Sequence, residues 1–283
     1  MFNTREPIRQ EECVSVIAQI SDIHVRPHGR RYQDLVDSNA MFAQAVATLN
    51  RLDPAPDFVL ISGDLTDEGR PDEYAMLREL LAPLRLPYAV MPGNHDHRRF
   101  LREAFADHAW LPREGELHFG IDAGAIRLLA LDSTVPGFHH GELSPASLDW
   151  LERELVEHAR RRVMIALHHP PFATGIPYLD LYGMTNVKPL RDLVARHANV
   201  DRIVAGHVHR SMHARLGNVP VLTCPSTTTQ IALRLQPDAD PASYMEPPAF
   251  MLHRWSDDDR DGESSAVSHL CYIGQFDGPL PFA

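Results

Sequence analysis

The sequence has few cysteines and no long apolar segment. Cys13, Cys224 and Cys271 are its three cysteines, and no CxxC spacing occurs. This argues against a cysteine-rich zinc site and predicts a reduced, cytoplasmic chain. No segment approaches the ~20 apolar residues of a membrane-spanning helix, and the polar segment of residues 1–13 lacks the apolar core of a signal peptide. We therefore expect no membrane partner.

Long basic runs are also absent. The net charge of −11 is spread along the chain, and the basic clusters are short: Arg30–Arg31, Arg98–Arg99 and Arg160–Arg162. Proteins that bind nucleic acids or anionic membranes non-specifically usually carry an excess of positive charge. The charge balance therefore predicts that no nucleic-acid polymer is a partner, and a small-molecule ligand is expected instead.

The hydrophobic pattern predicts an α/β protein. With 283 residues there is room for one large α/β domain and an appendage. Short apolar runs, typical of buried strands, alternate with amphipathic segments of helical period. The predicted strands are Val14–Ile20, Phe58–Ser62, Tyr88–Met91, Ile126–Leu131, Val163–Leu167 and Arg202–Ala205. The predicted helices are Asp34–Leu52, Pro71–Leu84 and Ser144–Ala159, with Leu35 among the apolar positions of the first and Val156 among those of the third.

The pattern changes after about residue 210. Met212–Leu216 and Val219–Thr223 flank Gly217-Asn218, which predicts a hairpin. An irregular, proline-bearing stretch follows, and then two strand-like runs, Phe250–Trp255 and Ser265–Ile273, surround an acidic turn. We divide the chain into a catalytic domain of residues 1–223 and a β-rich extension of residues 224–283. The extension has too little apolar material for its own core and is interpreted as a lid, an edge extension or an oligomer contact.

The sequence contains seventeen histidines, and several of them lie in short motifs that follow predicted strands. The carboxyl ends of strands in an α/β protein meet at one edge of the sheet, so the polar side chains of these motifs are expected to converge there. The motifs are Asp22-x-His24, Gly63-Asp64, Gly93-Asn94-His95-Asp96, His168-His169-Pro170 and Gly206-His207-x-His209.

Each motif alone has an ordinary explanation. A strand-end aspartate such as Asp22 or Asp64 often caps a turn or a helix. Alternate residues of an extended segment share a face, so His207 and His209 could bracket one site. Together the oxygen and nitrogen donors predict two divalent cations roughly 3.5–4 Å apart, an arrangement that hydrolyses phosphate esters.

The segments SDIH, GDLTDEG, PGNHD, LHHPP and GHVH resemble the signature of the calcineurin-like metallophosphoesterase superfamily. More narrowly, they resemble the class III cyclic nucleotide phosphodiesterases and the bacterial glycerophosphodiesterases of that superfamily. The resemblance implies a four-layer α/β/β/α sandwich with a β-rich C-terminal extension. It also favours a homodimer or a higher homo-oligomer, by analogy.

Residue by residue, the resemblance implies a complete binuclear metal site. One ion would be held by Asp22, His24 and His209, and the other by Asn94, His168 and His207, with Asp64 bridging both. Of the adjacent histidines we favour His168 as the ligand and His169 as an orienting or structural residue. Asp64 and His95 would be catalytic, and His95 would contact the phosphate and protonate the leaving alkoxide. Asn94, His95 and His209 would bind the substrate.

The donor set favours particular metals and a particular reaction. Imidazoles together with carboxylate and amide oxygens suit Mn²⁺, Fe²⁺, Zn²⁺ or Co²⁺. Two such ions neutralise phosphate oxygens and lower the pKa of a bridging water, which yields hydroxide for attack on a phosphodiester. We expect Asp67 or Asp96 to orient the ligands from behind. The predicted substrate is a small phosphodiester, either a 3′,5′-cyclic nucleotide or a glycerophosphodiester.

Other functions of the superfamily fit less well. Asp67 stands where purple acid phosphatases have a tyrosine, and Met91-Pro92-Gly93 stands where phosphoprotein phosphatases have an arginine. These departures argue against a phosphomonoesterase, and the lack of basic surface argues against a nuclease. A non-catalytic metal-binding scaffold would not need His95. Substrate selection is expected in Phe172–Val187 and Ser226–Pro248, where Tyr178, Tyr182 or Tyr244 would either stack on a base or pack the lid.

Overall fold

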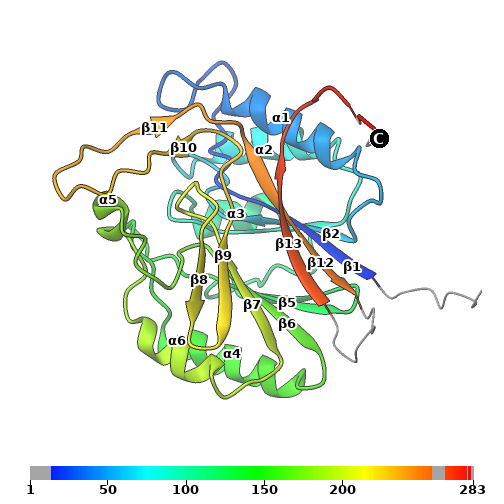
Figure 1. Ribbon diagram of the computed structural model, residues 1–283. Coiled ribbons are helices and arrows are strands. Elements are labelled where there is room, and N and C mark those ends of the chain that lie inside the picture. The colour runs from blue at the N-terminus through cyan, green and yellow to red at the C-terminus, as the bar shows by residue number, and fades with distance from the viewer. Residues whose placement is uncertain (1–13, 257–264, 279, 282–283) are drawn as a thin grey trace, which may run out of the picture.

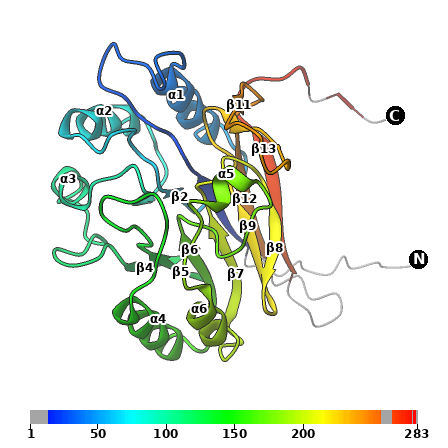
Figure 2. The same cartoon turned by 90° about the vertical axis from the view of Figure 1, so that its left-hand side faces the viewer.

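A computed structural model describes residues 14–256, 265–278 and 280–281. Two β-sheets pack face to face, and helices cover the outer face of each (Figures 1 and 2). The predicted α/β/β/α layering is therefore confirmed. Cys13 and the acidic turn predicted after Trp255 lie outside the described residues. Among those that are described, no helix is long and apolar enough to cross a membrane.

The first sheet has the strand order β13-β12-β1-β2-β3. Its three parallel strands are β1 (Val14–Ile20), β2 (Phe58–Ser62) and β3 (Tyr88–Met91). On the other side of β1, β12 (Ala249–Ser256) pairs antiparallel, and β13 (Ser265–Tyr272) pairs antiparallel with β12. The helices packed against this sheet are α1 (Ser38–Leu49), α2 (Pro71–Leu81) and α3 (Arg98–Ala104).

The second sheet has the order β4-β5-β6-β7-β9-β8. Its strands are β4 (Phe119–Ala123), β5 (Ile126–Leu131), β6 (Arg162–Leu167), β7 (Val200–Ala205), β8 (His213–Leu216) and β9 (Val219–Thr223). Helices α4 (Pro145–Glu157) and α6 (Val187–Val194) cover its outer face. A short helix, α5 (Pro177–Asp180), and an arm formed by β10 (Gln230–Ile231) and β11 (Ser243–Tyr244) project beyond the sheets (Figure 1).

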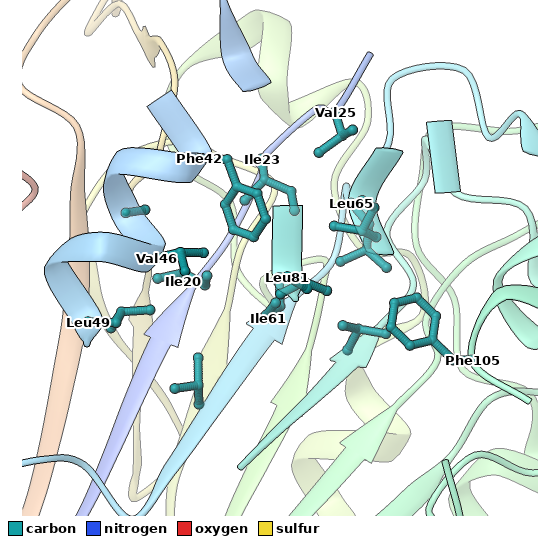
Figure 3. Close-up of a cluster of buried hydrophobic side chains, with 14 of the residues drawn as sticks. Ile20, Ile23, Val25, Phe42, Val46, Leu49, Ile61, Leu65, Leu81 and Phe105 are labelled. Atoms are coloured by element: carbon teal, nitrogen blue, oxygen red, sulfur yellow. The ribbon is translucent and has the colours of Figure 1, made fainter. Parts of the chain in front are cut away.

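Three apolar cores separate the four layers. Side chains alternate along each strand, so Ile17 and Leu60 enter the core between the sheets, whereas Ala18 and Ile61 face the helices. Figure 3 shows the core beneath α1, where Phe42 lies among side chains from the first sheet and from α2. Burial on both faces explains why β1 and β2 are mostly apolar rather than alternating.

Two expectations about helix faces are wrong. The Asp37 carboxylate accepts a hydrogen bond from the backbone N–H of Ala40 at 3.0 Å, so α1 begins at Ser38 and Leu35 lies in the preceding loop, 76% exposed. Val156 in α4 is 63% exposed, because the buried face of that helix is formed by Leu151 and Leu155. Both residues are apolar but contribute nothing to the core.

The parallel strands bring the five motifs to one edge of the molecule. The first three motifs follow β1, β2 and β3, and the last two follow β6 and β7. Backbone bonds join the loops, since the N–H of Asp22 donates to the carbonyl of Gly63 and the N–H of Gly206 donates to that of His168, both at 3.0 Å. The carboxyl ends of both sheets therefore form a single site.

Candidate metal centre

The seven predicted ligands lie together at this edge, and six of them are buried. Two groups of potential ligand atoms share Asp64: one joins it to Asp22, His24 and His209, and the other joins it to His168 and His207. Asn94 extends the second group, because its Oδ1 lies 2.9 Å from Nδ1 of His207. A carboxylate common to two groups is the arrangement expected of a bridging ligand.

Around the first group, donor atoms face one another without ordinary partners. Nε2 of His24 lies 3.1 Å from Nε2 of His209, and the latter is 3.5 Å from Oδ1 of Asp22. Nδ1 of His209 donates to the carbonyl of Thr229 at 2.9 Å, which leaves Nε2 with its lone pair. A backbone carbonyl behind an imidazole is a common way to orient a metal-binding histidine.

The second group distinguishes His168 from His169. Nδ1 of His168 donates to the carbonyl of Ser62 at 2.8 Å, while its Nε2 has no hydrogen-bond partner and lies 3.3 Å from Oδ2 of Asp64. Both ring nitrogens of His169 are already occupied, by Ser133 Oγ at 2.8 Å and by the carbonyl of His139 at 3.1 Å. The geometry therefore supports His168 as the ligand.

The electrostatics of the site favour bound positive charge. Burial opposes ionisation of Asp64, yet His168 and His95 hold its pKa well below its usual range. Burial alone would lower the pKa of His168, but the Asp64 carboxylate raises it to about 9. Burial lowers the pKa of His207 to about 3 and also lowers that of His209. The last two imidazoles are therefore neutral, which is the form that binds a metal.

The backbone around these side chains is strained. A positive φ is uncommon outside glycine and costs roughly 1 kcal/mol or more per residue. Of the eight described non-glycine residues with positive φ, five are predicted ligands, and their φ values lie between 44° and 71°. These five are Asp22, His24, Asp64, His207 and His209. Strain concentrated at one place indicates that the surrounding structure holds a functional geometry.

Two glycines make room for the ligands. A Cβ on Gly93 would lie 2.2 Å from Oδ1 of Asp64, and a Cβ on Gly63 would lie 2.3 Å from Nδ1 of His168. Gly63 also has a φ of 98°, which side-chain-bearing residues rarely adopt. The glycines in these motifs therefore do more than turn the chain, because they let the loops approach the ligands.

The residues around the ligands include both of the predicted supporting carboxylates. Oδ1 of Asp67 lies 3.7 Å from Nδ1 of His24 and from Nδ1 of His95, and the carbonyl of Asp67 accepts a bond from Nδ1 of His95 at 2.7 Å. Asp96 accepts bonds from the N–H groups of Gly93, Leu65 and Thr66. Asp67 therefore positions the imidazole of His95 and places a carboxylate beside that of His24, and Asp96 joins the loops that follow β2 and β3.

A cavity of about 520 Å³ opens above the metal ligands. His95 lines it beside the ligands, and the α5 region contributes Tyr178 and Tyr182. Pro241–Ser243 of the arm also lines it. Tyr244 instead lines a neighbouring depression beside α1. Both loops predicted to select the substrate thus reach the cavity, but only two of the three tyrosines do.

The residues present fit a pair of divalent cations. Nε2 of His168, which faces Oδ2 of Asp64, is buried without a hydrogen-bond partner. Buried polar atoms are rarely left in that state unless an unseen ion or water satisfies them. The donor set of imidazole nitrogens with carboxylate and amide oxygens is one that divalent transition metals accept.

Comparison with known proteins identifies the family. The model of the calcineurin-like phosphoesterase family matches residues 15–211, which include all five motifs. The chain belongs to this family. The predicted family is therefore confirmed, and divalent metal ions are the cofactors expected of a member that carries these donors.

Relatives agree with this assignment, and a solved structure shares the fold. An Arcobacter nitrofigilis protein named probable glycerophosphodiester phosphodiesterase is 34% identical, covering 94% of this chain and 96% of its own length. A Rhodopseudomonas palustris protein named probable cyclic nucleotide phosphodiesterase is 32% identical, covering 92% and 93%. The fold resembles a dimetal phosphatase from Danio rerio, with a TM-score of 0.61 at 15% identity over 92% of this chain and 99% of that one. The prediction of a metal-dependent phosphodiesterase is confirmed.

Sequence reasoning missed one residue at the centre of this phosphoesterase. His139 lines the cavity and lies 3.1 Å, through Nδ1, from the amide nitrogen of Asn94. It belongs to the segment Gly137–Gly141, which follows β5. The pair His139-His140 follows the carboxyl end of a predicted strand. This position alone could have indicated it, because the other motifs were found at the carboxyl ends of strands.

Proposed function

We propose that the natural substrate of this phosphodiesterase is a glycerophosphodiester. The observation that carries the proposal is a cavity directly above two ligand groups that share Asp64. Apart from the ligands, its wall includes the polar residues Gln33, Thr229 and Ser243, which suit the hydroxyl groups of glycerol. The Arcobacter relative, similar over almost its whole length, carries the corresponding name.

We infer that Asp22, His24 and His209 hold one divalent cation, that Asn94, His168 and His207 hold the other, and that Asp64 bridges them. When bound, the pair supplies Lewis acidity to the phosphate and an activated water. Mn²⁺, Fe²⁺, Zn²⁺ and Co²⁺ all suit this donor set. The unpartnered Nε2 of His168, 3.3 Å from Oδ2 of Asp64, supports the assignment.

The remaining residues of the centre bind the substrate and move a proton. Nδ1 of His95 donates to the carbonyl of Asp67, so Nε2 is the nitrogen left to face the substrate. From there it can contact a phosphate oxygen and protonate the departing alkoxide as a general acid. The backbone N–H of His95 donates to Oδ1 of Asp64 at 2.9 Å, which fixes the imidazole relative to the bridging carboxylate. Asn94 and His209 complete the proposed substrate-binding set.

A cyclic nucleotide is the second candidate substrate. The rings of Tyr178 and Tyr182 lie 5.4 Å apart, centroid to centroid, in an edge-to-face pair in the cavity wall. An exposed aromatic face offers a stacking surface for a base, a contact worth about 1–3 kcal/mol per base. The name of the Rhodopseudomonas relative favours the same substrate.

Initial rates on glycerophosphoethanolamine and on 3′,5′-cyclic AMP distinguish the two candidates. Apo-protein is reconstituted with Mn²⁺, and metal-free protein serves as the control. We expect a metal-dependent preference for the glycerol diester, and little change in that preference in Tyr178→Leu. A preference for cyclic AMP that Tyr178→Leu removes would favour the nucleotide. If neither diester were cleaved, the substrate proposal would be refuted. The assignment of the metal ligands would still stand, because metal binding is measured separately.

We infer further that residues 224–283 do not fold alone. β12 pairs with β1 over the register from Val14↔Ser256 to Gln19↔Met251, so it completes the first sheet rather than forming a sheet of its own. This supports the division of the chain into residues 1–223 and a dependent extension. A homo-oligomer and a cytoplasmic location stay predictions from the sequence.

A further inference from the structure

The loop between β5 and α4 delivers a histidine to a proposed metal ligand. Nδ1 of His139 lies 3.1 Å from Nδ2 of Asn94, while Oδ1 of the same amide lies 2.9 Å from Nδ1 of His207. The His139 ring also lies 5.6 Å from those of His95 and Tyr182, centroid to centroid. The imidazole therefore stands between the proposed metal centre and the aromatic wall of the cavity.

This loop is held in place from two sides, although His139 itself is exposed. Nε2 of His169 donates to the carbonyl of His139 at 3.1 Å, and Nδ1 of His169 faces the Ser133 hydroxyl. A Cβ on Gly141 would lie 2.4 Å from Cγ of His169, so only glycine allows the loop to pack this closely. The carbonyl of Gly141 also accepts a bond from the N–H of Thr185 at 2.7 Å. His169 thus has a role beside its neighbour His168, which is to anchor the loop.

The direction of the bond between Asn94 and His139 follows from donor and acceptor chemistry. An amide nitrogen only donates, so Nδ1 of His139 accepts in this contact. With Nδ2 of Asn94 donating to His139, the amide directs Oδ1 toward Nδ1 of His207 and the metal site. The amide oxygen is the end that a divalent cation can use.

We propose that His139 is a positioning residue that holds the oxygen of Asn94 on the second metal ion. The proposal rests on the ligand set given under the proposed function and extends it by one residue. Among the seven proposed ligands, Asn94 is the amide, and an amide can turn either its oxygen or its nitrogen toward the ion. His139 sets that orientation, whereas the four imidazole and two carboxylate ligands have no such choice. Loss of His139 should therefore lower the affinity for the ion held by Asn94, His168 and His207. The affinity for the other ion should be unchanged.

The test measures metal binding, so it does not depend on the substrate. Apo-protein is titrated with Mn²⁺ and followed by calorimetry for wild type, His139→Leu, His139→Gln and His140→Leu. Removing a residue that orients a ligand typically weakens metal binding by roughly 10–100-fold, and we expect a loss of this size for one ion in His139→Leu. Gln retains an acceptor for the Asn94 amide and should restore most of the affinity. His140, whose ring packs on Phe138, is the matched control and should have no effect.

A double substitution separates this proposal from the ligand assignment. Asn94→Ala should weaken the same ion, and adding His139→Leu to it should cause no further loss, because His139 acts through Asn94. Wild-type binding of both ions in His139→Leu, with one ion lost in Asn94→Ala, would overturn the role of His139 and leave the ligand set standing. Wild-type binding of both ions in Asn94→Ala would overturn both. Circular dichroism of each variant verifies that the fold is retained.

Discussion

At the scale of single residues, the site is recognisable because its chemistry is concentrated in short motifs. The turn at Gly63 directs Asp64 into the site. There Asp64 contacts histidines from other elements, such as His24 and His168. Each such contact joins residues far apart in the chain, which no local pattern encodes. The order of motifs along the strands supplied that information, because strand ends of an α/β sheet converge.

Asp64 and His95 should separate metal binding from proton transfer. Asp64→Ala removes the shared carboxylate, so we expect loss of the paired ions and of activity. His95→Ala keeps all seven proposed ligands, so both ions should bind while turnover falls by roughly 10²–10⁴-fold, the usual contribution of a general acid. Metal content after dialysis, compared with the rate of diester hydrolysis, checks both. Full activity in Asp64→Ala, or wild-type turnover in His95→Ala, would refute the corresponding role.

The adjacent histidines show what a sequence pattern leaves open. His168 and His169 are equivalent in the motif, and only the partner of each ring nitrogen distinguishes them. His139 was overlooked for a related reason. Its segment carries no carboxylate, and its partners Asn94 and His169 come from two other loops.

At the scale of elements, strands buried on both faces were the most predictable part of the fold. β1, β2, β3 and β5 have the predicted bounds, because a mostly apolar run between turn residues has few other interpretations. β4, α3 and α6 were not predicted. β4 is partly exposed in mid-strand, and α3 buries a single residue, Leu101, so tertiary packing rather than local pattern decides these two segments. α6, in contrast, buries Leu190, Leu193 and Val194 at helical spacing.

Asp96 should be the residue on which the alignment of two loops depends. Burial and the neighbouring Asp64 raise its pKa to about 6, so it is mostly ionised at pH 7, and it accepts bonds from three backbone N–H groups and from Tyr74. Asp96→Asn places an N–H₂ among these donors, and we expect a loss of about 3 kcal/mol in the free energy of unfolding together with weaker Mn²⁺ binding.

Tyr74→Phe is the graded control for this prediction. It removes only the hydroxyl, which donates to Asp96 at 2.9 Å and accepts the N–H of His97 at 2.8 Å, so a smaller loss of about 1 kcal/mol is expected. Urea denaturation in the presence of chelator measures both variants without the contribution of bound metal. Equal losses of unfolding free energy in the two variants would show that the Asp96 carboxylate does not align the two loops.

At the scale of the whole molecule, a buried polar network fixes one sheet against the other. Gln19 of β1 donates through Nε2 to Ser62 Oγ at 2.9 Å and to the carbonyl of Ala205 in the second sheet at 3.1 Å. Its Oε1 accepts from Nε2 of His253 at 3.1 Å, and Nδ1 of His253 faces Ser268 Oγ at 2.7 Å. The C-terminal strands therefore contribute polar bonds to the intersheet core, which no short-range pattern in the tail could reveal.

This network makes the stability of the whole fold sensitive to mild acid. Burial, with the Arg202 guanidinium adding to it, lowers the pKa of His253 to about 3, whereas an unfolded histidine titrates near 6.5. The unfolded chain binds the proton first, so the stabilisation is complete above pH 6.5 and is lost as the pH falls toward 3. Between pH 6.5 and pH 5 the loss from this residue is about 2 kcal/mol.

His253→Gln keeps polar partners for Gln19 and Ser268 but cannot titrate. Its unfolding free energy should therefore fall by about 2 kcal/mol less than that of the wild type over this interval, in urea with chelator present. His269→Gln, which replaces an exposed histidine of β13, is the matched control. The same pH dependence in wild type and His253→Gln would mean that the intersheet core accepts a charged imidazole at no cost.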